Sequence, residues 1–166
     1  SNTSALIVGG IPNVASNESW NGSSWTEVGD LNAGRSQAAG AGADNTSALC
    51  FAGSPALQTN EEWNGSSWTE VGDLNTGREN FTGAGTATAA LAISGGTPPG
   101  AVIANVESYN GSAWTEVADV SAARNGNASA GTTTAGLTMG GATPPITNTS
   151  EEFTTPTETT VTFTAS

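Results

Sequence analysis

The chain has 166 residues, and 15 acidic residues against three cationic ones give it a net charge of −12. It contains no His, one Cys and one Met. Without His it lacks the commonest general base and metal ligand. Without a basic patch it cannot neutralise phosphates as nucleic-acid binding requires. No apolar run approaches the roughly 20 residues of a membrane helix. We therefore expect neither nucleic acid nor membrane insertion, and a single domain or a piece of one.

An internal repeat organises the sequence. The segment Glu18–Leu31 recurs with few changes at Glu61–Leu74 and again at Glu107–Val120. The copies are 43 and 46 residues apart. Two positions mark every copy: a Trp (Trp25, Trp68, Trp114) and, ten residues later, an Arg (Arg35, Arg78, Arg124). A period of this length is typical of propellers and other repeat architectures.

Each repeat holds four short segments that we predict to be strands. The first unit has an apolar run at Ala5–Val8 ending in Gly-Gly, an aromatic segment at Glu18–Trp20 and a Trp segment at Ser24–Val28. A run of small residues at 37–43 opens the next unit. No segment has a 3.6-residue period, and Gly, Thr, Ser and Asn disfavour helix. Asn-Gly at 21–22, 64–65 and 110–111 predicts hairpins with type I′ turns.

Four antiparallel strands per repeat form one propeller blade. A blade cannot bury both of its faces alone, so blades stack around an axis. The strand of Gly and Ala suits the crowded axis, and the Trp strand suits the outer edge. The expected units are about 1–35, 36–78, 79–124 and 125–166. The fourth departs from the pattern after Phe153, and we expect its tail to add a closing strand.

These residues resemble the kelch-type β-propellers. The resemblance rests on the Gly-Gly, the aromatic residue (Trp20, Trp63, Tyr109, Phe153), the Trp five residues later and the Arg. It implies an all-β fold of about four four-stranded antiparallel blades, the first lacking its inner strand. Such a chain closes alone, joins a second copy in a larger ring, or belongs to a longer parent chain. We favour the last two. The near-identical units also resemble tail and fibre proteins of marine viruses, which implies a virion or extracellular surface.

The repeated charged and aromatic residues have structural and functional interpretations. We expect the three Arg residues to form ion pairs between blades with repeated acids, rather than a ring that binds an anion. We expect the Trp residues to pack in the blades rather than to stack on sugars. Calcium at Asp30, Asp73 and Asp119 is an alternative to loop capping, but no Asp-x-Asp-x-Asp spacing supports it. The structural set is therefore Arg35, Arg78, Arg124, Glu18, Glu61, Glu107, Trp25, Trp68 and Trp114.

Differences between the repeats are the better guide to function. The loop after each Gly-ended strand varies, and it covers 11–17, 54–60, 97–105 and 142–150. Loops on a rigid scaffold often carry binding. The candidate ligand-binding residues are Pro12, Asn13, Pro55, Gln58, Pro98, Pro99, Pro144 and Pro145.

No catalytic or cofactor motif appears, and we expect Cys50 to pack as a small buried residue. The leading hypothesis is a non-enzymatic module that binds a surface glycan or a protein. A structural or assembly subunit is the alternative, and a glycan hydrolase is a remote third one.

Overall fold

The computed structural model describes residues 3–142, 146 and 148–154. In these residues every regular element is a β-strand. The described part of the chain has no helix that is long and apolar enough to cross a membrane. The strands form four antiparallel sheets, each made of neighbours in sequence. The expected all-β architecture of repeated blades is confirmed.

The two central sheets are complete blades of four strands. The second sheet consists of β4 (Ala39–Asp44), β5 (Ser47–Phe51), β6 (Asn60–Trp63) and β7 (Trp68–Val71), in that order. The third consists of β8 (Thr82–Thr86), β9 (Ala89–Thr97), β10 (Ala101–Tyr109) and β11 (Trp114–Val117). The small-residue strand therefore forms one edge of each blade, and the Trp strand forms the other.

The two terminal sheets have three described strands each. The first consists of β1 (Ala5–Val8), β2 (Asn17–Trp20) and β3 (Trp25–Val28), and it lacks the small-residue strand. The fourth consists of β12 (Ala128–Gly131), β13 (Ala135–Met139) and β14 (Ser150–Thr154). The closing strand expected in the tail lies outside the described residues.

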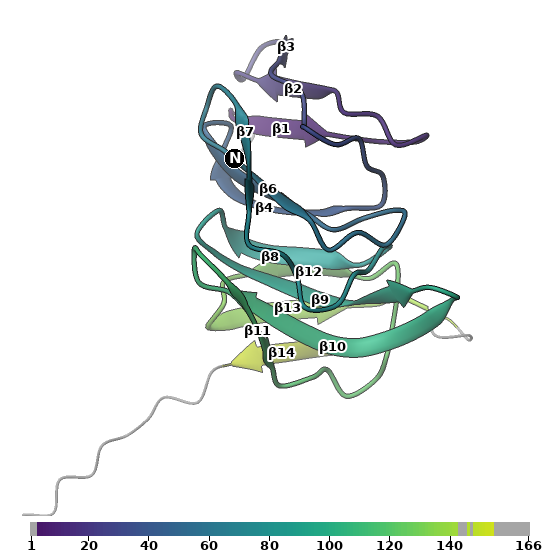
Figure 1. Ribbon diagram of the computed structural model, residues 1–166. Coiled ribbons are helices and arrows are strands. Elements are labelled where there is room, and N and C mark those ends of the chain that lie inside the picture. The colour runs from purple at the N-terminus through teal and green to yellow at the C-terminus, as the bar shows by residue number, and fades with distance from the viewer. Residues whose placement is uncertain (1–2, 143–145, 147, 155–166) are drawn as a thin grey trace, which may run out of the picture.

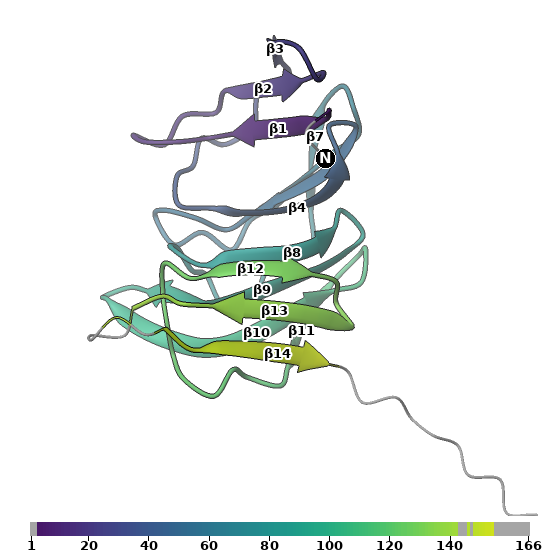
Figure 2. The ribbon, with the colours of Figure 1, turned by 180° about the vertical axis from the view of Figure 1, so that it is seen from behind.

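The sheets follow one another in chain order, with β1–β3 at one end and the two C-terminal sheets, β8–β11 and β12–β14, at the other (Figures 1 and 2). The small-residue strands β4, β8 and β12 contact each other from blade to blade. Gly83 shows why these strands carry small residues. A Cβ atom there would lie 2.5 Å from the Phe51 ring and 2.9 Å from the Gly40 carbonyl oxygen of the preceding blade.

Apolar side chains fill the space between successive blades. Trp63 and Trp68 pack with Leu31 against the first blade. Phe51 lies between the second and third blades, with its ring centroid 5.1 Å from that of Trp114. Leu91, Ile93 and Phe153 fill the third interface. Cys50 is buried as expected, because its side chain is part of the first of these clusters.

The hairpins at Asn-Gly form, but not with the predicted turn. Trp20 pairs with Trp25 across a four-residue loop, and Trp63 pairs with Trp68 in the same way. A type I′ turn needs positive φ at Asn and Gly alike, yet only the Gly has it, with φ 96° at Gly22. The Asn21 side chain replaces that geometry: its Oδ1 accepts the N–H groups of Ser23 and Ser24 at 2.9 and 3.0 Å.

Candidate binding face

The four variable loops lie at one edge of the stack, together with the linkers that join the blades. In every blade they connect the Gly-ended strand to the aromatic strand (β1 to β2, β5 to β6, β9 to β10 and β13 to β14), so strand direction brings them to the same side. Figure 1 shows the C-terminal end of β1 and the tip of the β9–β10 hairpin pointing the same way. We call the loops 9–16, 52–59, 98–100 and 140–149 the variable-loop face; residues 143–145 and 147 of the last loop are not described.

The linkers hold the base of each loop in place. The Leu31 and Arg35 amides donate to the carbonyl oxygens of Ala15 and Val14, at 2.9 and 3.1 Å. The same pair of bonds recurs in the next two repeats, from Leu74 and Arg78 to residues 58 and 57, and from Val120 and Arg124 to residues 104 and 103. In the first three repeats the linker therefore holds the chain on the C-terminal side of the loop tip.

Each Arg of the linkers enters an ion pair with a Glu of the following blade. Arg35 Nη2 lies 2.7 Å from Glu61 Oε1, and Arg78 Nη2 lies 2.5 Å from Glu107 Oε1. Arg124 pairs with Glu151 in the same way. Two further acceptors complete the Arg site: Arg78 Nη1 donates to the carbonyl oxygens of Ser94 and Asn105. One guanidinium thus joins the linker, the Gly-ended strand and the aromatic strand.

The carboxylates receive additional bonds from the same linkers. Glu107 accepts the Asn75 backbone and side-chain N–H groups at 2.8 and 2.9 Å, and the Thr76 amide at 3.2 Å. Burial lowers the pKa of Arg78, while Glu107 opposes that shift, as expected for a desolvated ion pair. All three Arg side chains are at most 1% exposed. These Arg residues are therefore part of the scaffold and unavailable to an anionic ligand.

One of the three acids that we expected to pair with an Arg does not do so. The sequence grouped Glu18 with Glu61 and Glu107, but Glu18 is exposed in β2 and pairs with no Arg of the described residues. The Glu151 carboxylate takes the third Arg instead, and sequence reasoning had not selected it. The signal was available, because Glu151 stands at the same repeat position as Glu61 and Glu107.

The three repeated Trp residues differ in how far their side chains are exposed. Trp68 and Trp114 are each 5% exposed, because the preceding blade covers them. Trp25 is 42% exposed, because no described blade precedes the first sheet. The three equivalent side chains therefore differ only in whether a neighbour covers them.

The candidate ligand-binding residues have different environments. Pro12 and Asn13 are exposed, and the Asn13 Oδ1 accepts a bond from Ser36 Oγ at 2.6 Å. Pro55 is exposed. The Gln58 side-chain amide instead donates to the carbonyl oxygens of Leu74 and Asn75, so it is bound to the linker that follows β7. Pro144 and Pro145 lie outside the described residues.

The third loop is shorter than expected. We predicted a loop over residues 97–105, but β9 extends to Thr97 and β10 starts at Ala101. Only Pro98, Pro99 and Gly100 remain as an exposed tip. The reason is strand pairing: Val102 and Ile103 pair with Gly96 and Gly95, with a register shift before Val106. The third blade therefore presents a stiff projecting hairpin.

The exposed loops carry no charged side chain and include exposed Ile residues. Ile11 is 82% exposed and Ile146 is 85% exposed, in the first and last loops. No charged residue occurs in the four loops 9–16, 52–59, 98–100 and 140–149. Among the described residues, no three His, Cys, Asp or Glu side chains gather as a metal site requires. The face offers backbone amides, hydroxyl groups, Pro rings and Ile side chains to a ligand.

Comparison with known proteins adds no assignment. The chain matches no protein-family model, and no curated protein matches it significantly.

Proposed function

We propose that the protein is a non-enzymatic recognition module whose variable-loop face binds an uncharged surface glycan or an uncharged patch of a protein. The observation that carries the proposal is the contrast in charge. The chain has a net charge of −12, yet the four loops of this face contain no charged residue. The linkers beside the loops carry the exposed acids Asp30, Asp73 and Asp119, but the loops themselves are uncharged. Uncharged loops suit a neutral ligand, held by hydrogen bonds and apolar contacts.

The scaffold supports this role. The linker amides fix the loop bases, and the buried Arg–Glu pairs tie each linker to its blade. Loop tips on such a frame can vary in sequence without loss of the fold, as the loops of many binding proteins do. Several weak contacts of this kind gain strength when many copies act together on one surface.

We further propose that the protein is a kelch-type β-propeller and that it lies at a virion or extracellular surface. It is supported by the Gly-ended strand, the aromatic residue, the Trp and the Arg that recur in every full repeat. The surface location rests on the likeness of the repeats to viral tail and fibre proteins. It accords with a composition rich in small and hydroxyl residues.

A glycan array tests the proposal, with the protein displayed multivalently at physiological salt, with and without calcium. The double variant Pro98→Ser/Pro99→Ser changes the tip of the third loop. The control Ala113→Ser lies in an Asn-Gly-Ser-Ala loop on the opposite edge and restores the sequence of the other two repeats. We expect binding that the control retains and the loop variant loses. Equal binding by both variants, or the absence of any glycan or protein ligand, would contradict the proposal.

One observation favours an assembly subunit as a second candidate. On the outer face of the first blade, Ile7 is 53% and Trp25 is 42% exposed, whereas the equivalent residues of later blades are buried. Light scattering coupled to size-exclusion chromatography separates the candidates. A stable oligomer without ligand binding supports the assembly subunit. A monomer that binds ligand supports the recognition module.

A further inference from the structure

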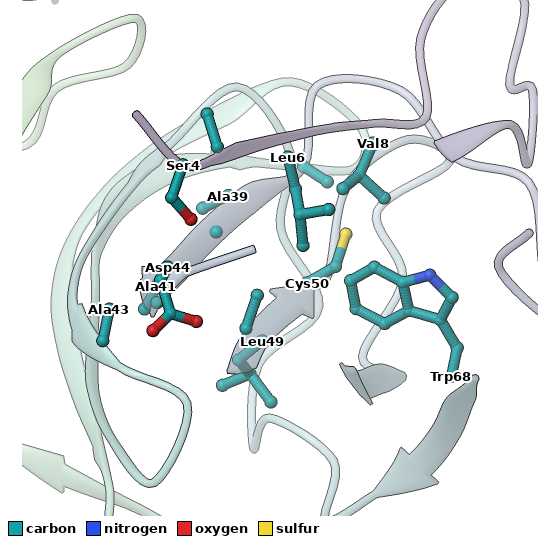
Figure 3. Close-up of a pocket in the computed structure, with 15 residues that line it drawn as sticks. Ser4, Leu6, Val8, Ala39, Ala41, Ala43, Asp44, Leu49, Cys50 and Trp68 are labelled. Carbon is teal, nitrogen blue, oxygen red and sulfur yellow. The ribbon is translucent and has the colours of Figure 1, made fainter. Parts of the chain in front are cut away.

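A cavity of about 420 Å³ lies between the first and second blades. Leu6 lines it from β1, and Cys50 and Trp68 line it from the second blade (Figure 3). The two side chains there that could carry chemistry are both unavailable. Asp44 Oδ1 accepts the Thr46 amide and hydroxyl at 2.8 and 2.6 Å. Burial keeps the Cys50 thiol neutral by raising its pKa to about 11. The groups that remain free to react lie in exposed loops elsewhere.

The chain contains four Asn-Gly pairs, and three of them occupy equivalent exposed loops. Asn21-Gly22, Asn64-Gly65 and Asn110-Gly111 connect the aromatic strand to the Trp strand in the first three blades. The fourth pair, Asn125-Gly126, lies in the linker between the third and fourth blades, where the Asn is half-buried. The four pairs therefore have the same sequence and different surroundings.

An Asn that precedes Gly can modify itself, with water as the co-reactant. The Gly backbone nitrogen attacks the Asn side-chain carbon Cγ, and a bond forms between these two atoms. The bond from Cγ to Nδ2 breaks, and ammonia leaves with the proton that the Gly nitrogen gives up. Water then opens the cyclic succinimide to Asp or to isoaspartate. Gly favours the attack because it has no Cβ atom to obstruct a close approach.

The attacking nitrogen is free in the loops and bound in the linker. Within the described chain, the amide N–H groups of Gly22, Gly65 and Gly111 donate no hydrogen bond. The Gly126 amide donates to the Asn80 carbonyl oxygen at 2.8 Å. A nitrogen held in this way has to break that bond before it can attack, which adds to the barrier. The structure therefore restrains the attacking group in only one of the four pairs.

The carbon under attack is activated in the loops. Asn64 Oδ1 accepts the Ser66 and Ser67 amides at 3.0 Å and the Ser66 hydroxyl at 2.9 Å. Asn21 and Asn110 have the same set of bonds. The attack places negative charge on this oxygen, and donors already aimed at it stabilise the transition state. In the part of the chain that the structure describes, Asn125 Oδ1 accepts no such bond.

We propose that Asn21, Asn64 and Asn110 are sites of spontaneous deamidation in the folded protein, and that the linker protects Asn125. Each conversion replaces a neutral amide by a carboxylate. It adds one negative charge at the edge opposite the variable-loop face, whose loops contain no Asn-Gly pair. The Asp product keeps the oxygen that accepts the loop bonds, whereas isoaspartate inserts an extra carbon into the backbone. Ageing therefore charges one edge of the protein and leaves the loops of the other edge unchanged.

Peptide mapping by mass spectrometry tests the proposal on the full chain, incubated at pH 8 both folded and in urea. In the folded protein we expect each loop Asn to convert at least about tenfold faster than Asn125, since a barrier difference of about 1.4 kcal/mol is sufficient. In urea the four rates should agree within about twofold, because only the shared Asn-Gly sequence remains. Asn125 is thus the matched control for the three loops.

The variant Ser66→Ala tests the donors to the Asn oxygen. It removes the hydroxyl bond to Asn64 and leaves both amide bonds in place. We expect Asn64 to convert roughly threefold more slowly, because water replaces one of its three donors at this exposed site. The Asn21 and Asn110 loops of the same molecule are the controls, and their rates should not change.

Three results would overturn the proposal. The first is conversion of Asn125 as fast as the loop residues in the folded protein. The second is conversion of the loop residues in urea but not in the folded protein, which would show that the loops hold the Gly nitrogen away from Cγ. The third is an unchanged rate at Asn64 in the Ser66→Ala variant, which would contradict activation by the donors.

Discussion

The buried Arg–Glu pairs are the clearest case in which single residues hold the scaffold. Glu107 is 1% exposed and accepts bonds from Arg78, Asn75 and Thr76, whereas Glu151 is 22% exposed. Glu107→Gln leaves the Arg78 charge uncompensated in the interior, and we expect a loss of about 3–5 kcal/mol in the free energy of unfolding. Glu151→Gln should cost about 1 kcal/mol, because water screens that site.

Urea denaturation of the two variants measures this difference. Glu70→Gln, an exposed acid, serves as the control and should change stability by less than about 0.5 kcal/mol. Equal losses in the Glu107 and Glu151 variants would show that burial does not decide the contribution of these pairs.

Cys50 should react slowly in the native state. Burial raises the pKa of its thiol to about 11, an effect that outweighs the opposing charge of Arg35. A thiol of pKa 9.0 in the unfolded chain therefore carries roughly 100 times more thiolate at pH 8. We expect a disulfide reagent to label Cys50 at pH 8 only at the rate of unfolding, and quickly in urea. Fast labelling of the folded protein would contradict the burial.

The same shift implies a pH dependence of stability. Since the folded pKa exceeds the unfolded one, the contribution of the neutral thiol is complete below pH 9.0 and is lost as the pH rises to about 11. The variant Cys50→Ala should lack this part of the alkaline decline, which thermal unfolding at pH 8 and pH 10.5 would detect.

At the scale of the element, the Asn-Gly-Ser loops depend on the side-chain oxygen of the Asn, Oδ1. Asn64 Oδ1 accepts the N–H groups of Ser66 and Ser67, both at 3.0 Å. Asn64→Ala removes this acceptor and should cost about 1 kcal/mol. Asn64→Asp keeps the acceptor and should cost much less. Thermal unfolding of the two variants gives the comparison, and equal losses would mean that the backbone alone holds the loop.

The repeated elements could be predicted from the sequence because their signals are local. The position of the hairpins follows from Asn21-Gly22 and its copies, and the small-residue strand follows from the run before Asp44. The turn type could not be predicted, because a side-chain bond competes with the backbone preference. The long hairpin at Pro98 was missed because two Pro residues suggested a loop, while pairing of Val102 and Ile103 with Gly96 and Gly95 extends the strands.

The candidate site was only partly predictable for a different reason. The variable loops stand out as differences between repeats, but Gln58 looked like a free polar side chain and is bound to the linker. The pairing of Arg124 with Glu151 and the isolation of Glu18 depend on which blade follows which linker. That information is geometric, since each Arg reaches forward into the next blade.

At the scale of the whole molecule, a stack of repeats should be stable in proportion to the neighbours that each blade has. Trp114 is 5% exposed between two blades, whereas Trp25 is 42% exposed on the first blade. Trp114→Ala should therefore cost about 3–5 kcal/mol, through lost burial and the cavity left behind. Trp25→Ala removes the same atoms from a half-covered surface and should cost about 1 kcal/mol.

Chemical denaturation at low protein concentration gives both values, because the two variants are identical in chemistry and differ only in position. A second measurement at high concentration then tests what covers the first blade in solution. If the Trp25→Ala loss stays small at both concentrations, the outer face of the first blade is free in the isolated protein. If the loss approaches that of Trp114→Ala as the concentration rises, another copy packs on that face, and the first blade behaves as an interior one.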